Sequence, residues 1–259
     1  MRKLFLIILI LMSYRLSLAE DIVVSAAYAY KTPISEIISL YKSKTGRNVV
    51  INMGTSVHLM NQIRAEAAVD VFLSAGIKEI EELLKEGLII KSSYHTFLSS
   101  GLSVAVNKKH KRIDKISHLR ELISPDFKTI AVGNPRTMPL GRYTEEVINF
   151  YQLNEKLRDK FIYVENFQQA IDYLVRQEVD AAIIFSHELV ARKEQITEIL
   201  SIDEKSHSPI LFAIAITSYS KNKSLANDFL KFMISQEAAE IFKKYGFRLI
   251  KGRVYEPYK

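Results

Sequence analysis

The chain of 259 residues contains no cysteine, and this absence narrows what it can be. Without cysteine there is neither a disulfide nor a lipobox thiol that could carry a lipid. The histidines show none of the spacings that a zinc site requires. The sequence also lacks a phosphate-binding loop and the G-x-S-x-G motif of hydrolases. These absences argue against a zinc protein, a nucleotide-binding protein with a phosphate-binding loop, and a hydrolase of the G-x-S-x-G type.

The N-terminal apolar run is too short to span a membrane, which takes ~20 residues. It extends over Leu4–Met12, follows Arg2 and Lys3, and precedes Ser17-Leu18-Ala19. A basic start, an apolar core and small residues before a cleavage point are the parts of a signal peptide. We therefore expect a signal peptide over residues 1–19, cleavage after Ala19, and an exported protein that lies in a bacterial periplasm.

Positive charge is neither strong nor concentrated. Removal of residues 1–19 takes three basic residues from the net charge of +7 and leaves +4. The densest basic run, Lys108–Arg112, follows a predicted strand and is typical of a solvated loop. Nucleic-acid binders usually concentrate charge on one face, so we expect no nucleic-acid partner.

The segment around Ser56 predicts a strand, a short joint and a helix. A β-branched run at 48–53 is typical of a buried strand, and apolar residues recur at helical spacing over 59–63. Residues 54–56 form the joint, with Ser56 as the predicted N-cap. A helix start has unpaired N–H groups and about half a positive charge, so such a joint can hold an anion. The alternative is that Ser56 only caps its own helix.

Similar joints recur where other apolar strands pass into helices. Some helix starts have proline at the first helical position, where no N–H is lost, and others have a capping side chain. Ligands of parallel sheets bind in the crevice beyond the carboxyl ends of the strands, where the first two joints lie. The predicted helix starts are Thr32 with Pro33, Ser56, Pro139 and Asn166, and a final helix is predicted over 224–245.

Strand and helix alternation predicts an α/β fold in which each of two domains has a mainly parallel sheet flanked by helices. The 240 residues that follow the signal peptide suit two such domains. Two linking strands, near 97–106 and 209–217, would carry the chain across and back and leave a cleft between the domains. The predicted lobes are 20–98 with 213–259 for lobe 1, and 99–212 for lobe 2.

Six segments, in order along nearly the whole mature chain, carry a family resemblance: Val24–Ala27, Gly54–Ile63, Val69–Ala75, Ala131–Tyr143, Asp180–Phe185 and Glu237–Phe247. They resemble the molybdate-binding periplasmic proteins of bacterial ABC importers. The resemblance implies the type II periplasmic-binding-protein fold, with two crossing strands at the hinge. It also implies that a tetrahedral oxyanion is held between the lobes by backbone amides and hydroxyls.

The resemblance assigns particular residues to that site. Ser56 falls on the ligand serine of the family, and Leu140 and Phe167 fall on two backbone-amide donors. Where the family commonly has a serine and a tyrosine, this chain has Ala29 and Phe185. Two hydroxyl donors are therefore missing, which would cost roughly 3–6 kcal/mol of binding if nothing replaces them.

Residues beside Ala29 are candidates to replace the missing donors. Tyr28, Tyr30, Lys31 and Thr32 all lie in the same joint. Lys31 stands out because most sites of this family use neutral donors, although a lysine before a helix is also typical of a solvent-facing position. The hypothesis is that Lys31 or a neighbouring tyrosine supplies the hydrogen bonds.

The resemblance implies high-affinity binding of molybdate or tungstate and delivery to an inner-membrane ABC permease. It implies no catalysis, no cofactor and no direct metal-cation ligands, and a monomer suits such a carrier. An iron(III)-binding or other-oxyanion carrier of the same fold is the alternative, with Tyr28 and Tyr30 as tyrosinate ligands. A hydrolase built on Ser56 and His58 is the least favoured, because residues two apart on a helix face different directions.

Overall fold

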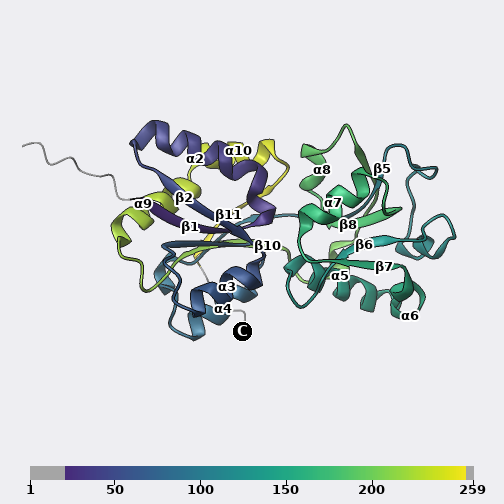
Figure 1. Cartoon of the computed structure of the whole chain (residues 1–259), viewed down its shortest axis with the longest axis horizontal. Coiled ribbons are helices and arrows are strands. Elements are labelled where there is room, and N and C mark those ends of the chain that lie inside the picture. Colours follow the sequence, from purple (N-terminus) through teal and green to yellow (C-terminus); the bar gives the residue numbers. More distant parts are fainter. Residues whose placement is uncertain (1–20, 255–259) are drawn as a thin grey trace, which may run out of the picture.

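The computed structural model describes residues 21–254, so the predicted signal peptide lies outside the described residues. Two lobes lie side by side, each with a sheet between layers of helices (Figure 1). Among residues 21–254, no helix has both the length and the apolar character that crossing a membrane would require.

Lobe 1 contains a six-stranded sheet with helices on both faces. Its elements are β1 Ile22–Ala27, η1 Tyr28–Tyr30, α2 Lys31–Thr45, β2 Val49–Gly54, α3 Ser56–Arg64, β3 Val71–Ser74, α4 Lys78–Lys85, η2 Lys91–Ser93, β4 His95–Ser99, β10 Leu211–Ile216, α9 Lys223–Met233, α10 Gln236–Lys244 and β11 Arg248–Val254. The strand order is β11-β4-β10-β3-β1-β2. Helices α2, α9 and α10 cover one face of the sheet, and α3 and α4 cover the other (Figure 1).

Lobe 2 contains a five-stranded sheet built from the middle of the chain. Its elements are β5 Leu102–Asn107, η3 Leu119–Ile123, β6 Ile130–Gly133, α5 Pro139–Phe150, α6 Asn154–Leu157, η4 Arg158–Lys160, β7 Phe161–Val164, α7 Phe167–Val175, β8 Ala181–Phe185, α8 Glu188–Ala191 and β9 Ile196–Ser201, and η5 Glu204–Ser206 follows β9. The strand order is β7-β6-β8-β5-β9. The starts of α5 and α7 point toward lobe 1.

The predicted two-lobe α/β fold is confirmed, but the sheets are mixed rather than mainly parallel. In lobe 1, β1 is parallel to β2 and β3, whereas β10 is antiparallel to β3 and β4. In lobe 2, β6 is parallel to its neighbours and β5 is antiparallel to β8 and β9. The reversals arise at the strands that carry the chain between the lobes, because a strand that returns must run opposite to the one that left.

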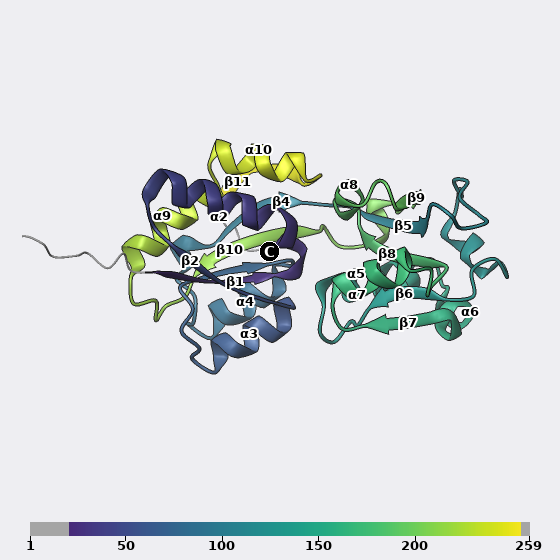
Figure 2. The same ribbon diagram turned by 45° about the horizontal axis from the view of Figure 1, so that its top comes forward.

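The chain crosses between the lobes twice, from β4 to β5 and from β9 to β10 (Figure 2). Ser99 of β4 pairs with Leu211 of β10 in the sheet of lobe 1. This pair lies a residue or two outside the boundaries predicted for that lobe at 98/99 and 212/213. Lobe 2 is therefore an uninterrupted stretch of chain inserted into lobe 1.

The predicted helix over 224–245 is two helices. Helix α9 ends at Met233, and Ser235 caps α10, since its hydroxyl accepts a hydrogen bond from the N–H of Ala238. Capping serines compete with helix continuation, and here the competition produces a corner. Strands β9 and β11 were not predicted from the sequence.

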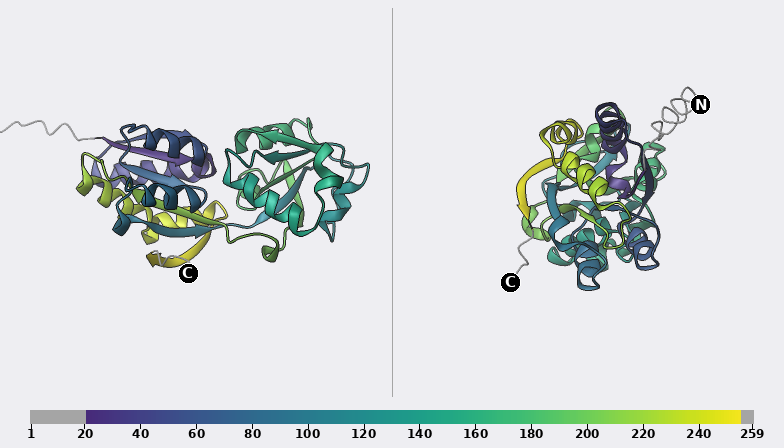
Figure 3. Two further views of the ribbon diagram at one scale, coloured as in Figure 1. Left: turned by 90° about the horizontal axis from the view of Figure 1, so that it is seen from below. Right: turned by 90° about the vertical axis from the view of Figure 1, so that its left-hand side faces the viewer.

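The two lobes lie side by side (Figure 3), and side chains of one lobe contact those of the other. One continuous cluster of buried apolar side chains includes residues of both lobes. At the contact, the ring of Phe185 in lobe 2 packs edge-on against Phe212 in lobe 1, with ring centroids 5.4 Å apart. The structure is thus a closed arrangement.

Candidate functional site

A compact cavity of about 30 Å³ lies between the lobes. Pockets for ordinary small molecules occupy ~300–1,000 Å³, whereas one water needs only ~10–15 Å³. The closed site therefore suits a guest of a few atoms. Its lining contains no charged side chain and consists of Ala27, Tyr28, Ala29, Gly54, Thr55, Ser56, Ala75, Met138, Pro139, Leu140, Phe167 and Phe185.

A larger cavity of about 650 Å³ lies at the opposite end of β1, and the charged residues in its lining are Asp21, Glu66, Asp70 and Lys221. The Asp70 carboxylate already accepts hydrogen bonds from the N–H of Val23 at 3.0 Å and the hydroxyl of Ser220 at 2.7 Å. Carboxylates repel an anion. The cavity between the lobes is therefore the better candidate for an anion site.

Three helix starts from the two lobes meet at the small cavity. Ser56 is the first residue of α3, Leu140 the second of α5, and Phe167 the first of α7. Within the described part of the chain, no acceptor takes a hydrogen bond from the backbone N–H of any of the three. Each helix start also carries a partial positive charge. The arrangement can solvate an anion with neutral donors.

Ser56 is buried, and its hydroxyl oxygen accepts a hydrogen bond from the N–H of Ala75 at 3.0 Å. The predicted N-cap at Ser56 is wrong by one residue. Thr55 has the extended backbone of an N-cap, and its hydroxyl accepts from the N–H of His58 at 3.3 Å. Because the Ser56 hydroxyl acts as an acceptor toward Ala75, and no described residue takes a hydrogen bond from it, its proton remains available for a guest.

The other residues assigned by resemblance lie around the same cavity. Ala29 lines it from lobe 1, and Leu140, Phe167 and Phe185 line it from lobe 2. Tyr28 lines it as well and is only half-buried. The methyl group of Ala29 and the ring of Phe185 contribute no hydrogen-bond donor, and Tyr28 is the lining residue of the first joint whose side chain carries a hydroxyl.

Tyr30 and Lys31 do not line the cavity. The hydroxyl of Tyr30 donates to the carbonyl oxygen of Ser74 at 3.1 Å, and complete burial raises the pKa of Tyr30. Lys31 is exposed. The predicted N-cap at Thr32 is also wrong, because the 3-10 turn η1 leads directly into α2 and the helix begins at Lys31.

Sequence reasoning missed part of the lining, namely Thr55, Ala75 and the pair Met138-Pro139. Ala75 directly follows β3, which is parallel to β1 and ends at the same edge of the sheet. That parallel pairing was the available signal, because neighbouring parallel strands present their carboxyl ends together.

The structure does not assemble the sites that the alternative functions need. Tyr28 and Tyr30 do not both reach the cavity, since the Tyr30 hydroxyl is bound within lobe 1. His58 is exposed and its Nε2 lies 2.9 Å from Gln62, whereas Ser56 is buried against Ala75. Residues 21–254 contain no group of three or more His, Asp or Glu side chains that could hold a metal ion.

Two lobes joined by two crossings, with donors of both lobes around one cavity, define a solute-binding protein that closes on its ligand. The chain belongs to the family of bacterial extracellular solute-binding proteins, whose model matches residues 22–248.

Individual relatives have similar lengths and moderate identity. The chain is 29% identical to YvgL of Bacillus subtilis (strain 168), a candidate ABC transporter substrate-binding lipoprotein by its description, over 86% of this chain and 85% of YvgL. It is 27% identical to the molybdate-binding protein ModA of Escherichia coli (strain K12), over 90% and 91% of the two chains. The periplasmic molybdate-binding protein of Azotobacter vinelandii superposes with a TM-score of 0.81 at 23% identity, over 89% of this chain and all of the other (100%).

Proposed function

We propose that this protein binds molybdate between its lobes and delivers it to the membrane permease of an ABC importer. The observation that carries the proposal is the set of unpaired backbone N–H groups of Ser56, Leu140 and Phe167 around one compact cavity. Relatives described as molybdate-binding proteins over nine-tenths of this chain support the choice of anion.

The available interactions are strong enough for tight binding. Micromolar to nanomolar affinity requires ~8–12 kcal/mol. Each helix start contributes ~0.3–2 kcal/mol through its dipole, and hydrogen bonds to a charged guest are worth ~1.5–3 kcal/mol each. Three helix ends with direct N–H donors and the Ser56 hydroxyl reach this range together.

The proposal extends to the finer points of the site. Tungstate has the same charge and tetrahedral shape and takes the same place. Tyr28 supplies the hydroxyl that Ala29 and Phe185 do not. The protein acts as a monomer in the periplasm after cleavage behind Ala19.

Calorimetric titration of dialysed protein with molybdate, tungstate and sulfate tests the proposal. Binding of molybdate with a micromolar or lower Kd is expected, and molybdate at a hundredfold excess over Kd stabilises the fold by about 2.7 kcal/mol. Ferric citrate in a parallel thermal-shift assay should produce no stabilisation. A shift with ferric citrate alone, or no heat with any of the three dianions, would contradict the assignment.

The role of Tyr28 is tested by Tyr28→Phe. Loss of one hydroxyl donor to a charged guest should weaken molybdate binding by about tenfold or more. Tyr30→Phe and Lys31→Met are matched controls, because the first hydroxyl is bound to Ser74 and the second side chain is exposed. Equal affinities for Tyr28→Phe and both controls would remove Tyr28 from the site.

A further inference from the structure

A buried ion pair joins the lobes beside the cavity. Arg142 Nη2 on α5 of lobe 2 contacts Glu79 Oε1 on α4 of lobe 1. The side chain of Glu79 is 2% exposed and that of Arg142 is 22% exposed. Since the two groups belong to different lobes, the pair exists only while the lobes are together.

Besides its place in the first turn of α4, where the helix dipole favours a carboxylate, Glu79 has little else to stabilise its charge when it is buried. Apart from Arg142, the hydrogen bond to its carboxylate within the described residues comes from the hydroxyl of Ser74 at a long 3.4 Å. A buried carboxylate without its cation is strongly unfavourable. When the lobes separate, water can replace Arg142 at Glu79, so the pair links burial of this carboxylate to closure.

The ion pair is mechanically connected to the cavity. Arg142 lies two residues after Leu140, in the same first turn of α5 that lines the cavity with Met138 and Pro139. A movement of α5 that takes Arg142 away from Glu79 therefore also moves the N–H of Leu140.

Gly76 allows the close approach that the ion pair needs. A Cβ atom at this position would lie 3.1 Å from the Cβ of Pro139 and 3.1 Å from Glu79 Oε2. The first contact is with the opposite lobe and the second with the ion pair itself. A side chain at Gly76 would therefore push Pro139 of the opposite lobe and the Glu79 carboxylate away by a few tenths of an ångström.

We propose that the Arg142–Glu79 pair is the latch of the closed state and sets the rate at which the bound anion leaves. The inference rests on the proposed function, because the latch acts on the same cavity. Arg142 and Glu79 are positioning residues, since neither lines the cavity.

A second interlobe pair provides a matched control. Arg248 on β11 contacts Glu204 on the β9–β10 connection, and their side chains are 56% and 63% exposed. Exposed pairs contribute little because water solvates both charges in either state. Glu204→Gln removes a carboxylate, as Glu79→Gln does, but from the connection between β9 and β10 at the hinge.

The latch is tested by the dissociation rate of radiolabelled molybdate, chased with unlabelled molybdate, for Glu79→Gln, Arg142→Met, Gly76→Ala and Glu204→Gln. Loss of a partner from a desolvated charge pair acts mainly on dissociation. Dissociation should be at least about tenfold faster for the first three variants and unchanged for Glu204→Gln, with association rates within about threefold of the unaltered protein. Dissociation within twofold of the unaltered protein for both Glu79→Gln and Arg142→Met would overturn the latch.

Small-angle scattering of the anion-free proteins separates the latch from the proposed function. Glu79→Gln and Gly76→Ala should have a larger radius of gyration than the unaltered protein and Glu204→Gln. If the unaltered protein binds none of the three dianions, the proposed function is wrong. The radius of gyration of the anion-free proteins is then the test of whether the Arg142–Glu79 pair holds the lobes together. Equal radii would overturn the latch, and a larger radius for Glu79→Gln would support it.

Discussion

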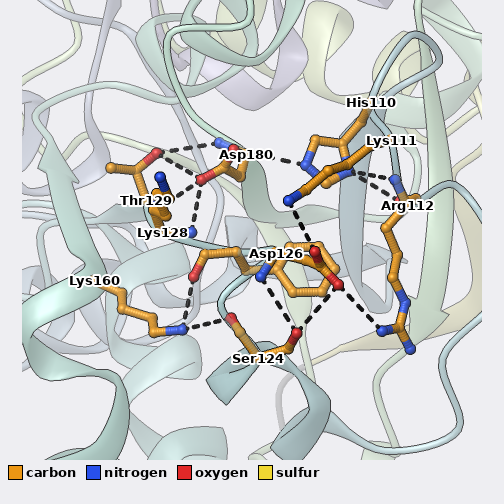
Figure 4. Close-up of polar contacts among 10 residues, drawn as sticks. His110, Lys111, Arg112, Ser124, Asp126, Lys128, Thr129, Lys160 and Asp180 are labelled. Atoms are coloured by element: carbon orange, nitrogen blue, oxygen red, sulfur yellow. Dashed lines mark hydrogen bonds and ion pairs between the residues drawn. The ribbon is translucent and has the colours of Figure 1, made fainter.

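Backbone groups at helix ends have different partners in the cavity between the lobes and in a polar cluster at the far end of lobe 2. In the cluster they bind charged side chains of the protein, whereas at the cavity they have no such partner within residues 21–254. In the cluster, Lys160 Nζ donates to the carbonyl oxygens of Leu122, Ile123, Ser124 and Phe127 at 2.7–3.0 Å, and Figure 4 shows Lys160 beside Ser124. These carbonyls lie at and after the end of η3, where a helix lacks internal donors. The protein thus holds its own cation at the end of a helix.

The same cluster also holds an anion of the protein. Asp180 Oδ2 accepts hydrogen bonds from the N–H groups of Lys128 and Thr129 at 2.7 and 2.9 Å (Figure 4). At the interlobe cavity, by contrast, backbone N–H groups converge and no charged side chain enters the lining. Backbone donors and acceptors stabilise the fold where a charged side chain of the protein is their partner. Where no charged side chain is present, they are free to bind a charged solute.

The largest effect is expected from Lys160→Met, which removes the cation from the cluster. Four carbonyl oxygens lose their common partner, and unfolding should become easier by about 2–4 kcal/mol. Chemical denaturation followed by circular dichroism measures the change, with Lys156→Met, an exposed lysine, as the control. Molybdate affinity should stay the same. Equal stability of the two variants would contradict the role of Lys160 in stabilising the fold.

The next effect is expected from Ser56→Ala at the cavity. Loss of a hydroxyl donor to a charged guest should weaken molybdate binding by about 10- to 150-fold. Ser39→Ala is the control, because this exposed hydroxyl donates to the carbonyl of Ser35 on α2. Calorimetry gives both affinities. A Ser56→Ala affinity equal to that of Ser39→Ala would mean that this hydroxyl serves only Ala75.

A smaller effect, visible only in acid, is expected from Asp180→Asn. Burial opposes the shift, but hydrogen bonds from Thr129 and Lys128 and the charge of His110 lower the pKa of Asp180. Since this pKa lies below the unfolded value of ~3.9, the carboxylate stabilises the fold above that pH, and the stabilisation is lost as the pH falls through the folded-state pKa.

Asp180→Asn should therefore lower Tm at pH 6 and reduce the further loss of Tm between pH 5 and pH 3. Thermal unfolding at several pH values measures both. Asp159→Asn is the control, because its side chain is 89% exposed. If the acid dependence of Asp180→Asn matches that of the control, the carboxylate does not depend on the N–H groups around it.

Much of the fold could be predicted because the signals were local. Pro139 at the first position of α5 and the side chain of Asn166, which accepts from the N–H of Gln169, mark helix starts that the structure confirms. Strand β11 could not be predicted in this way. It is rich in charge, and its partner β4 lies about 150 residues earlier in the chain, so its pairing depends on tertiary structure.

The resemblance assigned Ser56, Leu140 and Phe167 to the site, and the structure places all three in the lining of one cavity. The site could not be predicted where packing decides which way a side chain lies. Tyr28 and Tyr30 are two residues apart in one joint, yet the first lines the cavity and the second is sealed within lobe 1. The latch was also beyond sequence reasoning, because Glu79 and Arg142 meet only when the lobes close.

The insertion of lobe 2 into lobe 1 has a consequence for how the molecule assembles. In the sheet of lobe 1, β10 lies between β3 and β4, both of which are synthesised more than 100 residues before it. The strands of lobe 2 are complete once Ser201 has emerged, whereas the sheet of lobe 1 must wait for β10 and for β11, which ends at Val254. Because domains fold as units during synthesis, we expect lobe 2 to fold before lobe 1. The cavity between the lobes then forms last.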